Sequence, residues 1–248
     1  MRGLRGIMKQ MWWMWILMFL LGIGAGKGVQ TQQETENYLE SVVPATEQSV
    51  IQDTTAPCED AYDLPCAFPY TALVARELTA YDGPSLEDGA EVTREGVAAL
   101  VLENTGTVGI EFARIILVQN NQELCFDATY IPPRAKVLIL EKNGMPYSDL
   151  PVEECRVRTV IPGSYDWAKD RIGIEEHGLG SLAVTNLTDQ PIRCTRVFYK
   201  QHHGETDLYI GGITFSAVLN DLLPGETRVI TPYRYACGYS AIVAVVTE

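Results

Sequence analysis

The chain has 248 residues, 46% of them hydrophobic, and carries a formal net charge of −13 at pH 7. A chain of this length and apolar content can bury one large core or two smaller ones. Nucleic-acid binding requires a basic face, whereas Asp and Glu outnumber Lys and Arg here by 32 to 19, so nucleic acid is excluded as an expected partner.

Residues 1–27 have the pattern of a secretory signal peptide or of an N-terminal membrane anchor. Basic residues precede an uncharged apolar run that ends at Gly26. As a helix, the apolar run spans roughly 24 Å, somewhat less than the roughly 30 Å of a bilayer core, which favours cleavage after Gly26. Its three tryptophans favour a retained anchor at the membrane interface instead. Both alternatives place residues 28–248 outside the cytoplasm, either anchored at the cell surface or secreted.

Residues 28–70 form the next segment, which is rich in Gln, Thr, Glu and Ser and has few large apolar residues. Such a composition cannot bury enough surface to offset its ordering entropy, so the segment is predicted to be a flexible acidic and polar linker.

The cysteine count is even, which suits disulfides in an exported chain. The disulfide candidates are Cys58, Cys66, Cys125, Cys155, Cys194 and Cys237. Pairing within each segment predicts Cys58–Cys66, Cys125–Cys155 and Cys194–Cys237, and free buried thiols are the alternative.

From residue 71 the pattern changes to β-rich runs of five to eleven residues separated by turn sequences such as NTG, QNNQ and KNG. The runs carry β-branched and aromatic residues and show no helical periodicity between them. This pattern predicts an antiparallel β-sandwich rather than alternating strands and helices.

An internal repeat divides the β-rich region into two halves. The stretch GVAALVLENTGTVGIEFARIILVQ at residues 96–119 returns as GLGSLAVTNLTDQPIRCTRVFYKQ at 178–201, an offset of 82. Equivalent pairs at this offset include Leu100 and Leu182, Asn104 and Asn186, Arg114 and Arg196, and Cys155 and Cys237. Farther on, IPPRAKVLIL matches LLPGETRVIT at an offset of 92, which takes Val137 to Val229 and implies about ten extra residues in the second copy.

The repeat predicts an all-β fold with two tandem immunoglobulin-like antiparallel sandwich domains after an N-terminal apolar helix and a flexible linker. The predicted segments are 1–27 for the signal or anchor, 28–70 for the linker, 71–162 for domain 1, 163–170 for the interdomain linker and 171–248 for domain 2.

The order of motifs in each half resembles a known class of domain. A strand that ends in Asn is followed by a turn, an I-x-x-x-R strand, a hairpin and then, in the second half, P-G-E-T-x-V-I. This order is similar to bacterial immunoglobulin-like and FxLYD-type extracytoplasmic sandwiches, over residues 71–162 and 171–248. The resemblance implies a spacer, an adhesive module or an assembly partner. The first half departs from it with PPRAKV at the turn, and neither half contains the Phe-x-Leu-Tyr-Asp string.

The sequence contains no motif for catalysis, for a cofactor or for a metal. Its three histidines lie in turns, and the cysteines lack the spacing of a zinc site. Aromatic residues dominate interface energetics, so a candidate interaction surface consists of Tyr147, Trp167, Tyr209 and Tyr233. The leading hypothesis is a non-enzymatic cell-envelope protein that presents its domains for adhesion or surface assembly, with a protein or glycan as partner. A secreted ligand-binding or inhibitor module and a hydrolase with an interdomain site are the alternatives.

Overall fold

A computed structural model describes residues 63–84, 92–163, 168–203 and 206–248. All of these residues belong to one compact unit, Val50–Glu248. They form β-strands and connecting turns, which confirms the all-β prediction. Within these ranges no helix has the length and hydropathy that crossing a membrane requires. The prediction for residues 1–27 lies outside the described residues, and so does the predicted linker 28–70 as far as residue 62, whereas its last part, 63–70, is described and includes β1.

The strands follow one another with short connections. They are β1 Cys66–Ala67, β2 Leu73–Pro84, β3 Thr93–Asn104, β4 Gly109–Gln119, β5 Gln122–Ile131, β6 Lys136–Leu140, β7 Glu154–Gly163, β8 Ile172–Glu176, β9 Leu182–Asn186, β10 Ile192–His203, β11 Leu208–Leu222, β12 Thr227–Ile230 and β13 Ser240–Thr247.

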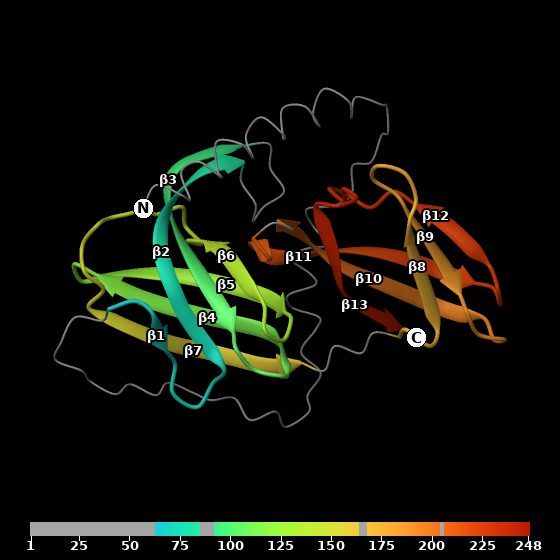
Figure 1. Cartoon of the computed structure of the whole chain (residues 1–248), viewed down its shortest axis with the longest axis horizontal. Coiled ribbons are helices and arrows are strands. Elements are labelled where there is room, and N and C mark those ends of the chain that lie inside the picture. Colours follow the sequence, from blue (N-terminus) through green and yellow to red (C-terminus); the bar gives the residue numbers. More distant parts are fainter. Residues whose placement is uncertain (1–62, 85–91, 164–167, 204–205) are drawn as a thin grey trace. The chain divides into compact units, whose positions relative to one another are not determined.

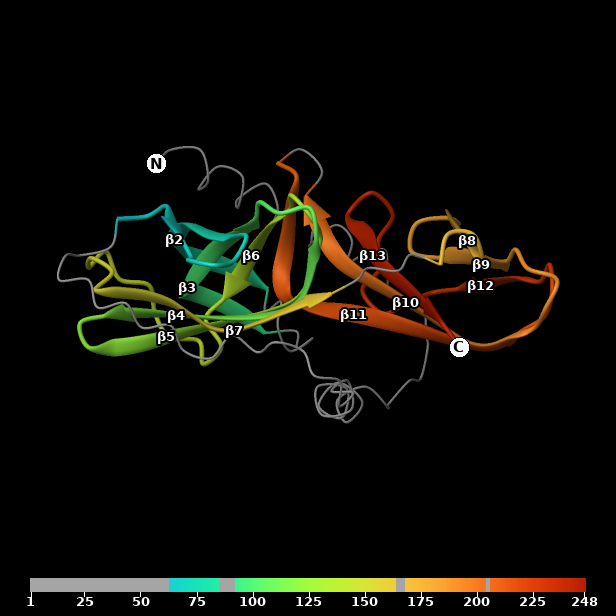
Figure 2. The ribbon, with the colours of Figure 1, turned by 90° about the horizontal axis from the view of Figure 1, so that it is seen from below.

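The strands form facing layers (Figures 1 and 2), and two clusters of buried hydrophobic residues lie among the described strands. In the first half, β1, β2, β3 and β6 face the sheet β5-β4-β7. Alternate residues of each layer, such as Leu100 and Ile115, point into the first core. In the second half, the sheet β12-β9-β8 faces β11, β10 and β13 across a core that includes Leu182 and Val197. Each half therefore buries the inner faces of two antiparallel layers.

The repeated asparagines occupy the same place in each half. Asn104 ends β3 and Asn186 ends β9, and both side chains are buried. The Asn104 amide donates hydrogen bonds to the carbonyls of Val108 at 2.9 Å and Pro132 at 3.1 Å. The Asn186 amide donates likewise to the carbonyls of Gln190 at 2.8 Å and Leu222 at 3.0 Å. Each asparagine thus joins two loops to the end of a strand in its half of the chain.

Strand pairing corrects the second offset of the repeat from 92 to 91. Leu102 pairs with Val137, whereas Val184, its counterpart at an offset of 82, pairs with Arg228 and not with Val229. The predicted alignment matched Pro132 with Pro224. In the structure the turns that precede the two strands match Pro133 with Pro224 instead.

The turns themselves explain that register. Ala135 donates its N–H to the carbonyl of Pro132, and Glu226 donates its own to that of Leu223. The third residue of each turn has a left-handed backbone, with φ of 58° at Arg134 and 69° at Gly225. A proline followed by a residue with positive φ is the pattern of a type II turn, in which glycine is the favoured third residue. The first half adopts the same turn with arginine in the strained position.

The difference between the two offsets, 82 and 91, is a nine-residue insertion in the second half, one residue fewer than predicted. The β4–β5 hairpin closes through Asn120 and Asn121, whereas the β10–β11 hairpin extends farther. In this extension Leu208–Ile210 pairs in parallel with Lys136–Leu138 of β6. The insertion therefore joins strands of both halves into one seven-stranded sheet, in the order β1-β2-β3-β6-β11-β10-β13.

A buried lysine supports the irregular start of this extension. Opposite Lys200 the pairing of β10 with β11 jumps from Phe215 to Ile210. The Lys200 ammonium is fully buried and donates to three successive carbonyls, those of Gly211, Gly212 and Ile213, at 3.1, 2.8 and 2.7 Å. A buried charge is tolerated when it is fully hydrogen-bonded, so Lys200 supplies the donors that the interrupted ladder lacks.

The irregular part of β11 between Ile210 and Phe215 also contacts β5. Thr129 and Thr214 exchange hydrogen bonds, since the Thr129 hydroxyl donates to Thr214 Oγ1 at 2.9 Å and the Thr214 hydroxyl donates to the Thr129 carbonyl at 3.0 Å. A Cβ on Gly212 would overlap the carbonyl oxygen of Asp127. Only glycine allows this close approach of two backbones.

Candidate functional site

The described cysteines, Cys66, Cys125, Cys155, Cys194 and Cys237, are all free thiols. Cys125 pairs with Ile116 and Cys155 pairs with Leu117 on opposite sides of β4. Because successive residues of a strand point to opposite faces, the predicted Cys125–Cys155 disulfide is wrong.

The predicted Cys194–Cys237 disulfide is also wrong. Cys194 hydrogen-bonds to Glu248 at one end of the β10–β13 pair, while Cys237 precedes the other end, where Gln201 pairs with Ser240. The length of a strand separates the two thiols. Cys58 lies outside the described residues, so the Cys58–Cys66 pairing stays a prediction.

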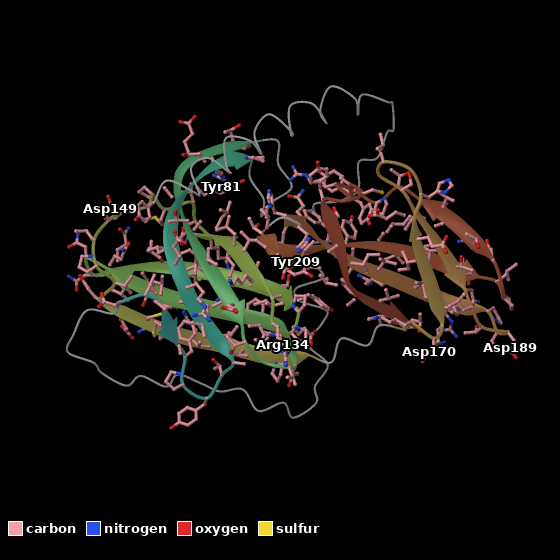
Figure 3. The ribbon with its side chains drawn as sticks, in the orientation of Figure 1. Tyr81, Arg134, Asp149, Asp170, Asp189 and Tyr209 are labelled. Atoms are coloured by element: carbon pink, nitrogen blue, oxygen red, sulfur yellow. The ribbon has the colours of Figure 1, made fainter. Side chains whose placement is uncertain are left out.

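Of the predicted interaction surface, Trp167 lies outside the described residues and the three tyrosines have different surroundings. Tyr147 and Tyr209 pack against the first core. Tyr209 lies where β11 meets β6 (Figure 3), and burial raises its pKa. Tyr233 is 52% exposed and contacts Phe215 of the second half edge-on. The three tyrosines therefore do not share one environment.

Histidine and carboxylate side chains take part in local polar contacts. His202 contacts Asp207 at 3.2 Å, and among the described residues no group of three His, Cys, Asp or Glu side chains could hold a metal ion. On the outer face of β5, Asp127 accepts hydrogen bonds from Arg114 at 2.6 Å and Lys142 at 3.1 Å. Burial raises the pKa of Asp127, but these two cations outweigh it and hold the pKa below its ordinary value.

A groove of about 400 Å³ at the side of the second half is the best candidate site, and it was missed by sequence reasoning. It is called here the β8–β13 groove. Its lining residues are Lys169, Ile172, Ile174, Glu176, Tyr235, Ser240, Ile242 and Val245. Its volume lies in the range of small-molecule binding sites, about 300–1,000 Å³.

The groove lies between two sheet edges. β8 ends the sheet β12-β9-β8, and β13 ends the seven-stranded sheet. Alternate residues of β8, namely Ile172, Ile174 and Glu176, share one face of that strand and line one wall. Ile242 and Val245 of β13 line the other wall. The walls are thus apolar and continuous with the second core, to which Ile172 and Val245 belong.

One end of the groove is polar. The Tyr235 hydroxyl donates to Glu176 Oε1 at 3.0 Å, and the backbone N–H of Gly238 donates to the same oxygen at 3.3 Å. Burial and this hydrogen bond raise the pKa of Tyr235. The Tyr235 ring packs edge-on against Tyr199, with centroids 5.5 Å apart. Tyr235 and Glu176 are therefore held in fixed positions at the mouth.

The corresponding space in the first half is filled by β1. Leu73 pairs with Asn104 as Ile172 pairs with Asn186, so β2 corresponds to β8. β1 pairs with β2 through Ala75, the counterpart of Ile174 in the groove wall.

The opposite wall corresponds in the same way. Cys155 of β7 pairs with Leu117, and Ile242 of β13 pairs with Tyr199, the counterpart of Leu117 at an offset of 82. Cys155 thus corresponds to Ile242, not to Cys237 as predicted. The flanks of β1 fill the interior, since Phe68 is buried and Leu64 packs against the first core.

No family model, curated protein or solved structure matches this chain.

Proposed function

We propose that the chain is a non-enzymatic protein of the bacterial cell envelope that presents two immunoglobulin-like sandwiches outside the membrane and binds a protein partner. The partner supplies an extended segment, which adds to the edge of β8 and places apolar side chains in the β8–β13 groove. The basic and apolar pattern of residues 1–27 supports the envelope location.

The observation that carries this proposal is the contrast between the two halves. The first half fills the space between its outer strands with the Leu64–Phe68 segment, whose β1 strand pairs with β2. The second half has the same strands, and a groove lies in the corresponding place. Addition of a strand to a sheet edge gives affinity through backbone hydrogen bonds and specificity through side-chain pockets.

The chemistry of the lining selects the kind of segment. The groove walls contain four aliphatic side chains, those of Ile172, Ile174, Ile242 and Val245. They favour a bound segment that has apolar residues at alternate positions, because alternate residues of an extended chain point to the same side. Glu176 and Lys169 at the rim favour polar or charged groups at the ends of the segment. The only carboxylate among the lining residues, Glu176, is already engaged by Tyr235, an arrangement that favours binding over acid–base catalysis.

The test is selection of displayed random octapeptides on the purified full chain. We expect enriched sequences with apolar residues at alternate positions. The variant Ile174→Arg, which places a cation in the groove wall, should reduce binding of the selected peptides at least tenfold. Val229→Arg changes an exposed position of the same three-stranded sheet and should leave binding unchanged. Equal binding by both variants would refute the groove as the site.

The location is tested separately by fractionation and intact mass of the protein made in its own host. Full-length protein in the membrane fraction supports the anchored form, and soluble protein that begins near Lys27 supports the secreted alternative.

A further inference from the structure

Two thiols meet at the side of the first sandwich that β1 closes. Cys66 lies on β1, one of the two terminal strands of the seven-stranded sheet, and Cys155 lies on β7, a terminal strand of the facing sheet. Cys155 is 8% exposed and belongs to the first core, and the half-buried Cys66 packs against that core. The two residues therefore come from opposite layers of one sandwich.

The side chains are directed toward the same core. Cys66 pairs with Ala75 and Cys155 pairs with Leu117, both of which belong to the first core. Burial together with the neighbouring Cys66 raises the pKa of Cys155. Two other cysteines have different surroundings: the Cys125 thiol contacts Asp127 at 3.9 Å, and the Cys237 thiol donates to the Gly178 carbonyl at 2.7 Å.

We propose that Cys66 and Cys155 form a disulfide that links the two layers of the first sandwich. The bond would tie β1 to β7 at the position where the second half has the β8–β13 groove. Ile242, the counterpart of Cys155, cannot form such a bond, so the cross-link is specific to the first half. This inference does not depend on the proposed function.

The reaction requires a disulfide donor of the glutathione disulfide class. The more exposed Cys66 loses its proton, and its thiolate attacks one donor sulfur, which forms a mixed disulfide and releases one donor thiol. The Cys155 thiolate then attacks the Cys66 sulfur and releases the second donor thiol. Two protein thiols are oxidised by two electrons in total, the donor disulfide is reduced to two thiols, and the protons are transferred to these leaving groups.

The experiment treats the purified full chain with glutathione disulfide, blocks the remaining thiols by alkylation after denaturation, and maps the proteolytic peptides by mass spectrometry. We expect one cross-linked peptide pair that contains Cys66 and Cys155, about 2 Da lighter than the sum of its reduced peptides. The variant Cys155→Ser should lose this species, whereas Cys125→Ser, at a thiol on the other face of the same sheet, should retain it.

Alkylation of both Cys66 and Cys155 in the treated protein would overturn the proposal, and so would a link from Cys66 to Cys58. The wild-type map gives this answer even if a serine variant does not fold.

Discussion

Replacement of Asn186 by alanine is expected to lower the free energy of unfolding by about 3 kcal/mol. The side chain is fully buried and makes four hydrogen bonds. The bond to the Leu222 carbonyl is itself buried, and loss of its donor costs about 2 kcal/mol. The other bonds join Asn186 to Thr188 and Gln190 near the surface, where water replaces them in part, so together they contribute about 1 kcal/mol.

The assay is urea unfolding of the full chain followed by far-ultraviolet circular dichroism. With a slope near 2.5 kcal/mol per molar urea, the midpoint should fall by about 1 M. Asn104→Ala should give a similar loss, because Asn104 makes the same type of contacts in the first half. Asn220→Ala, at an exposed position of β11, is the control and should cost less than about 0.5 kcal/mol. A loss at Asn186 no larger than this control would refute the reasoning.

Three further predictions concern the turns, the joined sheet and acid stability. Arg134→Gly should stabilise the chain by about 0.5–1 kcal/mol, because it relieves backbone strain, and should therefore raise the melting temperature. Gly225→Ala should lower the melting temperature. Equal melting temperatures for the two variants in calorimetry would contradict the shared turn. Gly212→Ala should cost more than about 3 kcal/mol, because its Cβ overlaps the β5 backbone, whereas Gly173→Ala, where a Cβ makes ordinary contacts, should change the urea midpoint little. The stability that comes from the lowered pKa of Asp127 is present above the unfolded-state pKa of about 3.9 and is lost as pH falls through the folded-state value. Asp127→Asn should therefore flatten the acid limb of the stability curve, and an unchanged limb would exclude this contribution.

The strands and the repeat could be predicted from sequence because their signals are local. Alternating β-branched residues indicate the strands. An asparagine at the end of a strand, followed by a turn, occurs at the equivalent position of both halves, as Asn104 and Asn186. The register of the last strands could not be read in this way. PPRA and LPGE each contain a proline, and only the left-handed backbone at Arg134 and Gly225 fixes which prolines correspond.

The contact between the two halves has no local signal. Parallel pairing of β11 with β6 joins residues about seventy positions apart and depends on a nine-residue insertion that reads as a longer hairpin. Tyr209 was predicted for an exposed surface because aromatic residues are common at interfaces, yet the insertion places it in this junction.

The groove was missed because no motif defines it: it lies where the described part of the second half has no counterpart of β1. Its isoleucines have the same alternation as core residues elsewhere in the chain. The cysteine pairs were predicted by segment, whereas the fold places Cys66 and Cys155, which come from different segments and layers, at the same core.

Hydrogen exchange of β8 with and without a groove-filling peptide tests the central claim most directly. The probe is a synthetic peptide with the sequence of residues 63–70, the segment that includes β1, with serine in place of its cysteine. If the β8–β13 groove accepts an extended segment, the peptide should slow exchange at the amides of Ile172–Glu176 in the full chain and not in the Ile174→Arg variant. Unchanged exchange in β8 at saturating peptide, or equal protection in the variant, would contradict the account.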